Sequence, residues 1–106
     1  MYRPLPESVT IKQSGINGLG LFADQDIKQA TNLGMSHLKI EDTIFRTPLG
    51  GFINHANDAN CVKTELHMTS EDIKGNSYNY KKWNLITIKD IKEGEELTVR
   101  YTFYNV

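Results

Sequence analysis

Alternation of apolar and polar positions is the clearest pattern along this chain. It is most regular near the C-terminus, where one set of alternate positions is apolar or aromatic: Leu97, Val99, Tyr101 and Phe103. The positions between them are Thr98, Arg100, Thr102 and Tyr104. A period of two is typical of a strand with one buried face, so a half-buried strand is predicted here.

A hairpin is predicted near the N-terminus. Val9 and Ile11 alternate with polar residues, Asn17-Gly18 supplies turn residues, and residues 19–23 are mostly apolar. This order indicates a strand, a tight turn and a second strand. Two further strands are predicted at residues 62–68 and 85–88, where apolar residues alternate with polar ones or form a β-branched run.

Helical spacing is weak throughout the chain. No stretch of about eleven residues repeats apolar positions every three to four residues, so we expect at most short helical turns, at residues 38–45 or after Ser70. Gly50-Gly51 and residues 70–80 are expected to be loops, with Lys74-Gly75-Asn76-Ser77 as an exposed tip. The predicted fold class is mainly β.

Length and charge narrow the choice of function. A chain of 106 residues has room for one domain, expected to span residues 1–106. Twelve Lys and Arg oppose 13 Asp and Glu, which gives a net charge of −1. A chain so close to neutrality has no overall attraction to phosphate or anionic lipid, which argues against nucleic-acid and membrane partners.

Cys61 is the only cysteine of the sequence. It cannot form an internal disulfide or a cysteine-built zinc site, and we expect it to be a small buried apolar residue. His37 and His67 have no partner at metal-ligand spacing and are expected to be structural or solvated. No apolar run approaches the roughly 18 residues of a membrane span, and the N-terminus does not resemble a signal peptide, so a cytoplasmic protein is expected.

Four segments carry residues that could perform chemistry. They are Gly18-Leu19-Gly20, residues 51–61 with Asn54-His55, the acidic turn and strand of residues 91–101, and the tyrosines Tyr101 and Tyr104. Taken singly, each fits an ordinary hairpin, turn or amphipathic strand. The glycine segment lacks the third glycine and the helix of a dinucleotide-binding fingerprint.

Taken together and in this order, G-L-G, F-I-N-H and G-E-E-L-T-x-x-Y closely resemble the SET domain of protein lysine methyltransferases. The resemblance implies a β-clip of small sheets in which the C-terminal segment passes beneath a loop near the Asn-His motif, a pseudoknot that would bring Asn54-His55 next to Tyr101. The compact form is similar to small viral or phage-type SET proteins, which act inside an infected host cell. The sequence departs from the family pattern at Ala56, at Ala59 and in the short region of residues 28–48.

The resemblance also implies an activity and a set of site residues. The activity is methyl transfer from S-adenosylmethionine to the ε-amine of a lysine in a protein or peptide, with no metal. Tyr101 is implied as the catalytic residue, and Tyr101 with Gly18, Leu19, Gly20, Asn54 and His55 would hold the methyl donor. Phe52, Phe103 and Tyr104 are implied to line the lysine channel.

Alternatives remain open on the sequence alone. A β-clip module could bind without turnover, and a structural β-clip protein, capsid-associated or antifreeze-like, would have no donor pocket. Trp83 could cover the adenine of the donor or pack on the core. An apolar patch of Phe45, Phe52 and Phe103 is expected near the site, which favours a homodimer.

Overall fold

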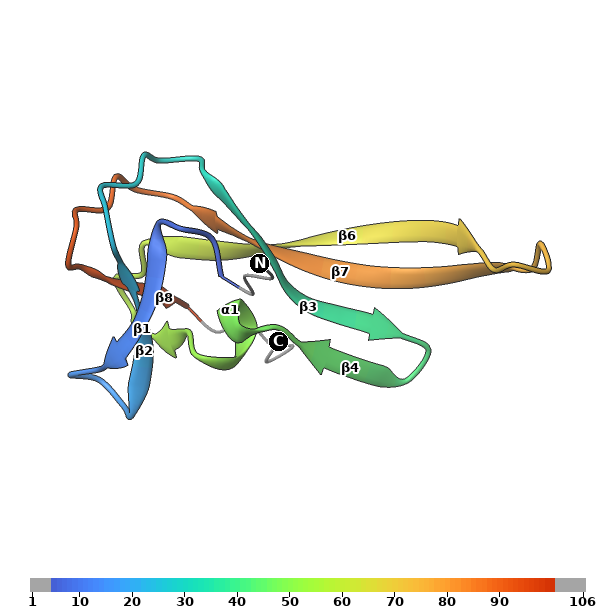
Figure 1. Ribbon diagram of the computed structural model, residues 1–106, viewed down its shortest axis with the longest axis horizontal. Coiled ribbons are helices and arrows are strands. Elements are labelled where there is room, and N and C mark those ends of the chain that lie inside the picture. Colours follow the sequence, from blue (N-terminus) through green and yellow to red (C-terminus); the bar gives the residue numbers. More distant parts are fainter. Residues whose placement is uncertain (1–4, 101–106) are drawn as a thin grey trace.

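Eight strands form the sheet structure of the protein, in the order β1-β2-β8-β6-β7-β3-β4 with β5 attached to β8. The computed structural model describes residues 5–100 (Figure 1). The elements are β1 (Val9–Gln13), β2 (Leu19–Ala23), β3 (Asn32–Ile40), β4 (Thr43–Arg46), α1 (Pro48–Gly51), β5 (Asn54–His55), β6 (Cys61–Glu71), β7 (Ser77–Thr87) and β8 (Glu96–Val99). The prediction of a mainly β fold is confirmed.

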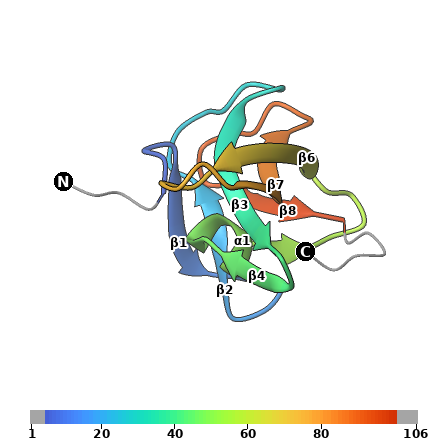
Figure 2. The same ribbon diagram turned by 90° about the vertical axis from the view of Figure 1, so that its right-hand side faces the viewer.

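The molecule has a body and an arm. In the body, β1, β2, β5, β8 and α1 come together, while β6, β7, β3 and β4 run side by side into an arm that projects from it (Figures 1 and 2). The principal extents are 47 × 35 × 25 Å. The buried core lies in the body and at its junction with the arm. Its members are Val9, Leu21, Ala23, Ile27, Leu33, Leu49, Ile53, Cys61, Leu85, Ile91, Leu97 and Val99.

The N-terminal hairpin forms as predicted. β1 and β2 are antiparallel, from Val9 opposite Ala23 to Gln13 opposite Leu19. Gly18 lies in the turn with φ of +49°, a left-handed conformation that costs glycine little.

Both predicted strands of the arm are confirmed, and both are longer than the sequence indicated. β6 and β7 pair without interruption from Cys61 opposite Thr87 to Glu71 opposite Ser77. The loop predicted for residues 70–80 is therefore only a short turn. Asp72 Oδ1 accepts the N–H groups of Lys74 and Asn76, both at 2.9 Å, which allows the chain to reverse direction quickly.

The helical turns predicted for residues 38–45 are wrong, because this region forms the β3–β4 hairpin. Its period-two pattern is broken by register shifts against β7 on either side of Gly34 and Met35, and Gly34 has φ of +117°. Each shift moves the following side chains to the other face, so the alternation in the sequence is lost.

The loop predicted at Gly50-Gly51 is also wrong, because both glycines lie in the short helix α1. Pro48 occupies the first turn of α1, where its missing N–H has no cost. A Cβ on Gly50 would lie 2.2 Å from the carbonyl oxygen of Ser36, so glycine permits α1 to pack directly on β3.

The final described strand, β8, is surrounded by earlier parts of the chain. It pairs antiparallel with β2, parallel with β5, and with the first residue of β6. The strand predicted from Leu97 onward is confirmed up to Val99, but Thr98 is buried too, so its described part is not half-buried. Its remainder, with Tyr101, Phe103 and Tyr104, lies outside the described residues. Among residues 5–100, no helix has the length and apolar character needed to cross a membrane.

Candidate functional site

The Asn54-His55 segment lies beside the strand that leads to Tyr101. Asn54 is opposite Thr98 and His55 is opposite Val99 in the parallel pairing of β5 with β8. The Ala56 N–H continues this pairing with a 3.0 Å hydrogen bond to the Val99 carbonyl. The structure therefore brings the second and third sequence motifs together, two residues before Tyr101.

The Asn54 amide nitrogen lies within hydrogen-bond distance of four oxygens. They are Glu96 Oε2 at 2.8 Å, Ser14 Oγ at 3.1 Å, the Asn17 carbonyl at 3.1 Å and the Leu19 carbonyl at 3.2 Å. We call these four atoms the oxygen cluster. An amide nitrogen has only two hydrogens, so these contacts must be shared. The oxygen cluster draws on the β1–β2 turn and on the start of β8.

Ser14 and Glu96 complete this arrangement, and sequence analysis missed both as site residues. The Ser14 hydroxyl lies 2.8 Å and 2.9 Å from the two carboxylate oxygens of Glu96. The same Oγ accepts the N–H of Ile16 at 2.9 Å, which fixes the turn. Glu96 belongs to the acidic segment singled out in the sequence, but a hairpin explained that segment equally well.

Gly20 lies directly against the side chains of Glu96 and Asn54. A Cβ at this position would lie 2.4 Å from Glu96 Oε2 and 3.0 Å from the Asn54 amide nitrogen. Glycine is therefore required for β2 to approach this close. The neighbouring Leu19 is 51% exposed. The glycine segment and Asn54 thus lie together, as the resemblance implied.

Asn60 is a second asparagine that fixes the site and that sequence analysis missed. Its side-chain amide donates to the Glu96 carbonyl at 2.9 Å, and its Oδ1 accepts the Thr98 N–H at 2.9 Å. The side chain thus acts as a short strand partner for β8. A signal existed in the Asn/Asp-rich stretch after His55, but a turn explained that composition too.

Of the other site residues that the resemblance implied, some are described by the structure and others lie outside the described residues. His55 is half-buried in β5, and Phe52 is 37% exposed directly after α1. Tyr101, Phe103 and Tyr104 lie outside the described residues. Of the residues implied by the resemblance to line a lysine channel, only Phe52 is among the described residues.

Trp83 and His37 belong to the core at the base of the arm. Trp83 on β7 is buried and its ring meets that of His37 on β3 edge-on, with centroids 6.3 Å apart. Burial, helped by the charges of Lys63 and Arg46, lowers the pKa of His37 to about 4, so the ring is neutral at pH 7. The structure favours the core-packing interpretation of Trp83.

Cys61 is buried at the start of β6, as predicted. Burial raises the pKa of its thiol to about 12, which leaves it protonated and unreactive at neutral pH. Across residues 5–100, no three His, Cys, Asp or Glu side chains gather as metal ligands would.

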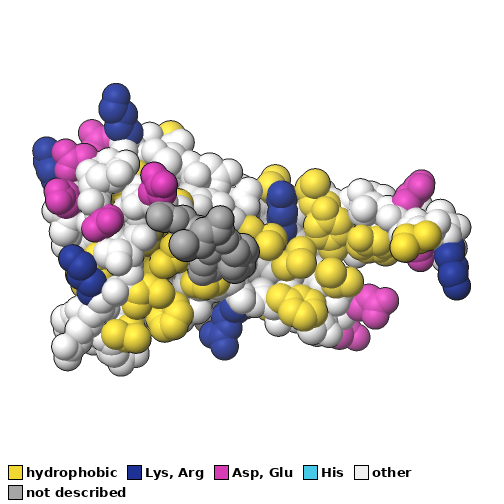
Figure 3. Space-filling view, viewed as in Figure 1, with side chains coloured by type: hydrophobic (Ala, Val, Ile, Leu, Met, Phe, Trp, Pro, Cys, Tyr) yellow, Lys and Arg dark blue, Asp and Glu magenta, His cyan; other side chains and the backbone are white. Residues whose placement is uncertain are grey.

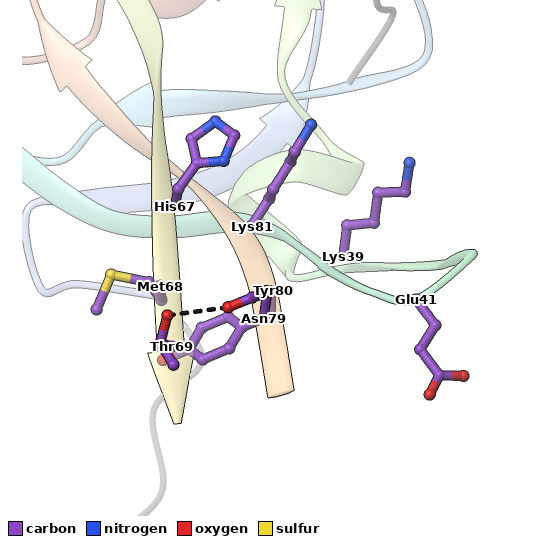
Figure 4. Close-up of a pocket in the computed structure, with 8 residues that line it drawn as sticks. All are labelled: Lys39, Glu41, His67, Met68, Thr69, Asn79, Tyr80 and Lys81. Carbon is purple, nitrogen blue, oxygen red and sulfur yellow. Dashed lines mark hydrogen bonds between the residues drawn. The ribbon is translucent and has the colours of Figure 1, made fainter. Parts of the chain in front are cut away.

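A separate hollow of about 340 Å³ lies on the arm (Figure 4). It is lined by Lys39, Glu41, His67, Met68, Thr69, Asn79, Tyr80 and Lys81. None of these residues belongs to the sequence motifs or to the oxygen cluster. The hollow has no part in the candidate site.

Comparison with known families adds a decisive observation. The sequence matches the SET domain over residues 36–102, a span that includes Asn54, His55, Glu96 and Tyr101. The chain belongs to the SET-domain family. No curated protein matches its sequence.

Solved structures agree with this SET domain in fold. A candidate histone methyltransferase of Plasmodium falciparum superposes with a TM-score of 0.65 at 14% identity, covering 92% of this chain and 96% of that one. Polycomb Repressive Complex 2 of Chaetomium thermophilum, bound to an inhibitor, gives a TM-score of 0.65 at 22% identity. The same complex bound to S-adenosylmethionine gives 0.63 at 21% identity.

The two Chaetomium matches cover 91% and 89% of this chain but only 15% of the chains they come from. This SET domain therefore corresponds to a small part of that protein. At these identities the comparison establishes the fold, and the mainly β SET architecture expected from the motifs is confirmed.

Proposed function

We propose that this SET domain is an S-adenosylmethionine-dependent protein-lysine N-methyltransferase. The observation that carries the proposal is the meeting of three motifs at one place: the glycine turn at β2, Asn54-His55 on β5 and the β8 segment before Tyr101. The candidate histone methyltransferase among the similar structures supports the same class of substrate.

The residues present fit the proposed methyl donor. The oxygen cluster is rich in hydrogen-bond acceptors and includes a carboxylate, a set that suits an ammonium group or amide N–H groups. Gly18, Leu19 and Gly20 would offer backbone groups to the methionyl part of the donor, the Asn54 side chain would bind near its amino group, and the His55 main chain would contact the adenine.

When bound, S-adenosylmethionine supplies an electrophilic methyl group on a sulfonium. Transfer would join the lysine nitrogen to the methyl carbon as the bond from carbon to sulfur breaks, and the nitrogen would give up one proton to solvent. A free lysine has a pKa of about 10.4, so holding its amine neutral at pH 7 costs roughly 4.6 kcal/mol. An apolar channel built from Phe52, Phe103 and Tyr104 would lower that cost by desolvating the charged form.

Alignment of the amine with the methyl group is the larger contribution. Holding two reacting groups in the productive geometry contributes on the order of 7–11 kcal/mol. The proposed role of the Tyr101 hydroxyl is to fix this geometry as a neutral phenol. The parallel pairing of β5 with β8 supports this role, because it anchors the chain two residues before Tyr101.

A binding module without turnover is the second candidate, and one contact favours it. The Asn54 amide already donates to oxygens of this chain, so it stabilises the β1–β2 turn whether or not a ligand is present. Such a module would bind the donor or a peptide and transfer no methyl group.

Calorimetry and methyl transfer distinguish the two candidates. We expect S-adenosylmethionine and its demethylated product to bind, and label from the donor to appear on lysines of a protein substrate. Tyr101→Phe should lower turnover far more than donor affinity, whereas Asn54→Ala should weaken donor binding by roughly 1.5–3 kcal/mol.

The matched controls are Tyr78→Phe and Asn79→Ala, which alter exposed side chains on the arm and should leave both measurements unchanged. Donor binding without label transfer would favour the binding module. No heat of binding at millimolar donor would refute both the enzyme and a donor-binding module.

A further inference from the structure

The outer edge of β6 lacks a partner strand over most of its length. β6 pairs with β7 along all eleven of its residues, but with β8 only through Cys61. Within the described part of the chain, Val62–Glu71 therefore has a neighbouring strand on one side alone. Figure 1 shows this edge along the outside of the arm.

This edge has few of the features that protect sheet edges from pairing. Protected edges are short, carry proline or charged residues, or contain a bulge, and of these features β6 has charged residues such as Lys63 and Glu65. β6 contains no proline or glycine, and its register with β7 has no shift. At the opposite edge of the arm, β4 has only four residues. The long, regular edge of β6 is thus the one suited to accept another strand.

One face of the arm is also largely apolar, although Lys82 lies on it opposite Leu66. Register places Val62, Leu66, Met68, Tyr78, Tyr80 and Phe45 on this face. Val62, Leu66 and Phe45 are 40%, 38% and 52% exposed. Figure 3 shows hydrophobic side chains gathered along the arm. The apolar face reaches the free edge at β6, where a neighbouring strand would extend it.

We infer that two copies of the chain associate through this edge, with β6 of each copy antiparallel to β6 of the other. An antiparallel pair of identical strands has two-fold symmetry, the commonest symmetry of soluble homodimers. With the axis at Leu66, the two Leu66 side chains face each other, and residues 62–70 form a ladder about 30 Å long.

The charges of β6 favour this register. On the polar face, this register places Glu65 of each copy opposite His67 of the other. Two such contacts form, one on each side of the axis. Within one chain, Glu65 already approaches His67 at 3.4 Å and Lys81 at 3.8 Å, so the added contact extends an existing group of charges. A register moved by two residues would place the two His67 side chains opposite each other and would lose both contacts between Glu65 and His67.

This self-complementarity identifies a second copy, rather than an unrelated peptide, as the partner. The interface is independent of the proposed methyl transfer. It differs from the patch expected from the sequence, because Phe45 lies on the arm whereas Phe52 lies after α1. The oxygen cluster comes from the β1–β2 turn and β8, which belong to the body and not to the arm (Figure 1).

The first test is the mass of the full chain in solution. Sedimentation at micromolar concentration should give twice the 12.1 kDa of one chain. Leu66→Lys places two lysines opposite each other at the axis and should give the monomer mass. Ile88→Lys changes a residue of similar exposure away from the arm edge and should remain dimeric. A monomeric native chain at 100 µM overturns the inference.

The second test locates the contact by cross-linking. Leu66→Cys should form a disulfide-linked dimer under mild oxidation, because opposing residues of antiparallel strands have Cα atoms roughly 4.5–5.5 Å apart. The native Cys61 is buried and does not compete. Phe45→Cys, an exposed position on the opposite edge, should link much more slowly. A dimer that links through Phe45→Cys and not through Leu66→Cys would show that the apolar faces stack instead, and would overturn the β6 contact.

Discussion

Glu96→Gln is the substitution that most directly tests how the candidate site is held together. The native carboxylate receives the Asn54 amide at 2.8 Å and the Ser14 hydroxyl at 2.8–2.9 Å. Glutamine has the same size but is uncharged and has one accepting oxygen, which the Asn54 amide and the Ser14 hydroxyl must share. Its NH₂ group then faces the Ser14 oxygen, which already accepts the Ile16 N–H. The attachment of the β1–β2 turn to Glu96 should therefore weaken, while the pairing of β2 with β8 remains.

The size of the effect follows from these contacts. Hydrogen bonds to charged groups contribute about 1.5–3 kcal/mol each, against about 1 kcal/mol for neutral ones. Asn54 keeps the carbonyls of Asn17 and Leu19 as acceptors, so the loss is partial. We expect the free energy of unfolding to fall by about 1–3 kcal/mol.

Urea unfolding followed by tryptophan fluorescence measures this loss, because Trp83 is the only tryptophan and is buried. With a slope of about 1–3 kcal/mol per molar urea, the midpoint should fall by roughly 1 M. Glu93→Gln makes the same charge change at an exposed side chain in the turn that precedes β8, and it serves as the control. Equal midpoints for the two variants would refute the attachment. In a double-mutant cycle, Glu96→Gln and Asn54→Ala should be non-additive.

Three other predictions concern the junction of body and arm. Gly50→Ala should destabilise the fold by about 1–3 kcal/mol, since its Cβ would meet the Ser36 carbonyl, whereas Gly51→Ala has open space and should be neutral or slightly stabilising in thermal unfolding. Because the pKa of His37 is about 4 when folded and near 6.5 when unfolded, the unfolded chain binds more protons between these values, and stability should fall as pH drops from 6.5 to 4. His37→Phe should make stability depend less on pH, and His67→Gln at an exposed position should not. Urea midpoints measured between pH 4 and 6.5 test this, and the same pH dependence in the native chain and both variants would contradict the role of His37. Cys61 should resist iodoacetamide at pH 8 in the native chain and react in urea, as mass spectrometry would show, and rapid native labelling would mean that the thiol is not enclosed.

Sequence patterns predicted the parts of the fold that depend on near neighbours. The β1–β2 hairpin and the strands beginning near Val62 and ending near Ile88 were predicted because their alternation is unbroken and their turn residues are distinctive. The β3–β4 hairpin was missed because register shifts near Gly34 hide its alternation. Helix α1 is a single turn, too short for helical spacing to show.

The candidate site was predicted in outline for a different reason. The resemblance indicated Gly20 and Asn54, and the structure places them in contact range of the same carboxylate. The carboxylate itself, and the Asn60 side chain that holds β8, could not be predicted because these contacts join residues 36 or more positions apart. Local pattern carries no information about which distant polar groups will meet.

The central position of β8 determines when the fold can form. β8 is the last described strand in chain order, yet it lies between β2 and β6 and pairs with β5. When only the first 95 residues have been synthesised, the edges of β2 and β6 that pair with β8 have no partner strand. The pairing of Leu21 with Leu97 closes a very long loop. The chain loses the entropy of closing this loop before most core contacts have formed to compensate for it. Folding should therefore be slow and delayed until synthesis of β8, and chaperones that bind exposed strands would act on the chain during this interval.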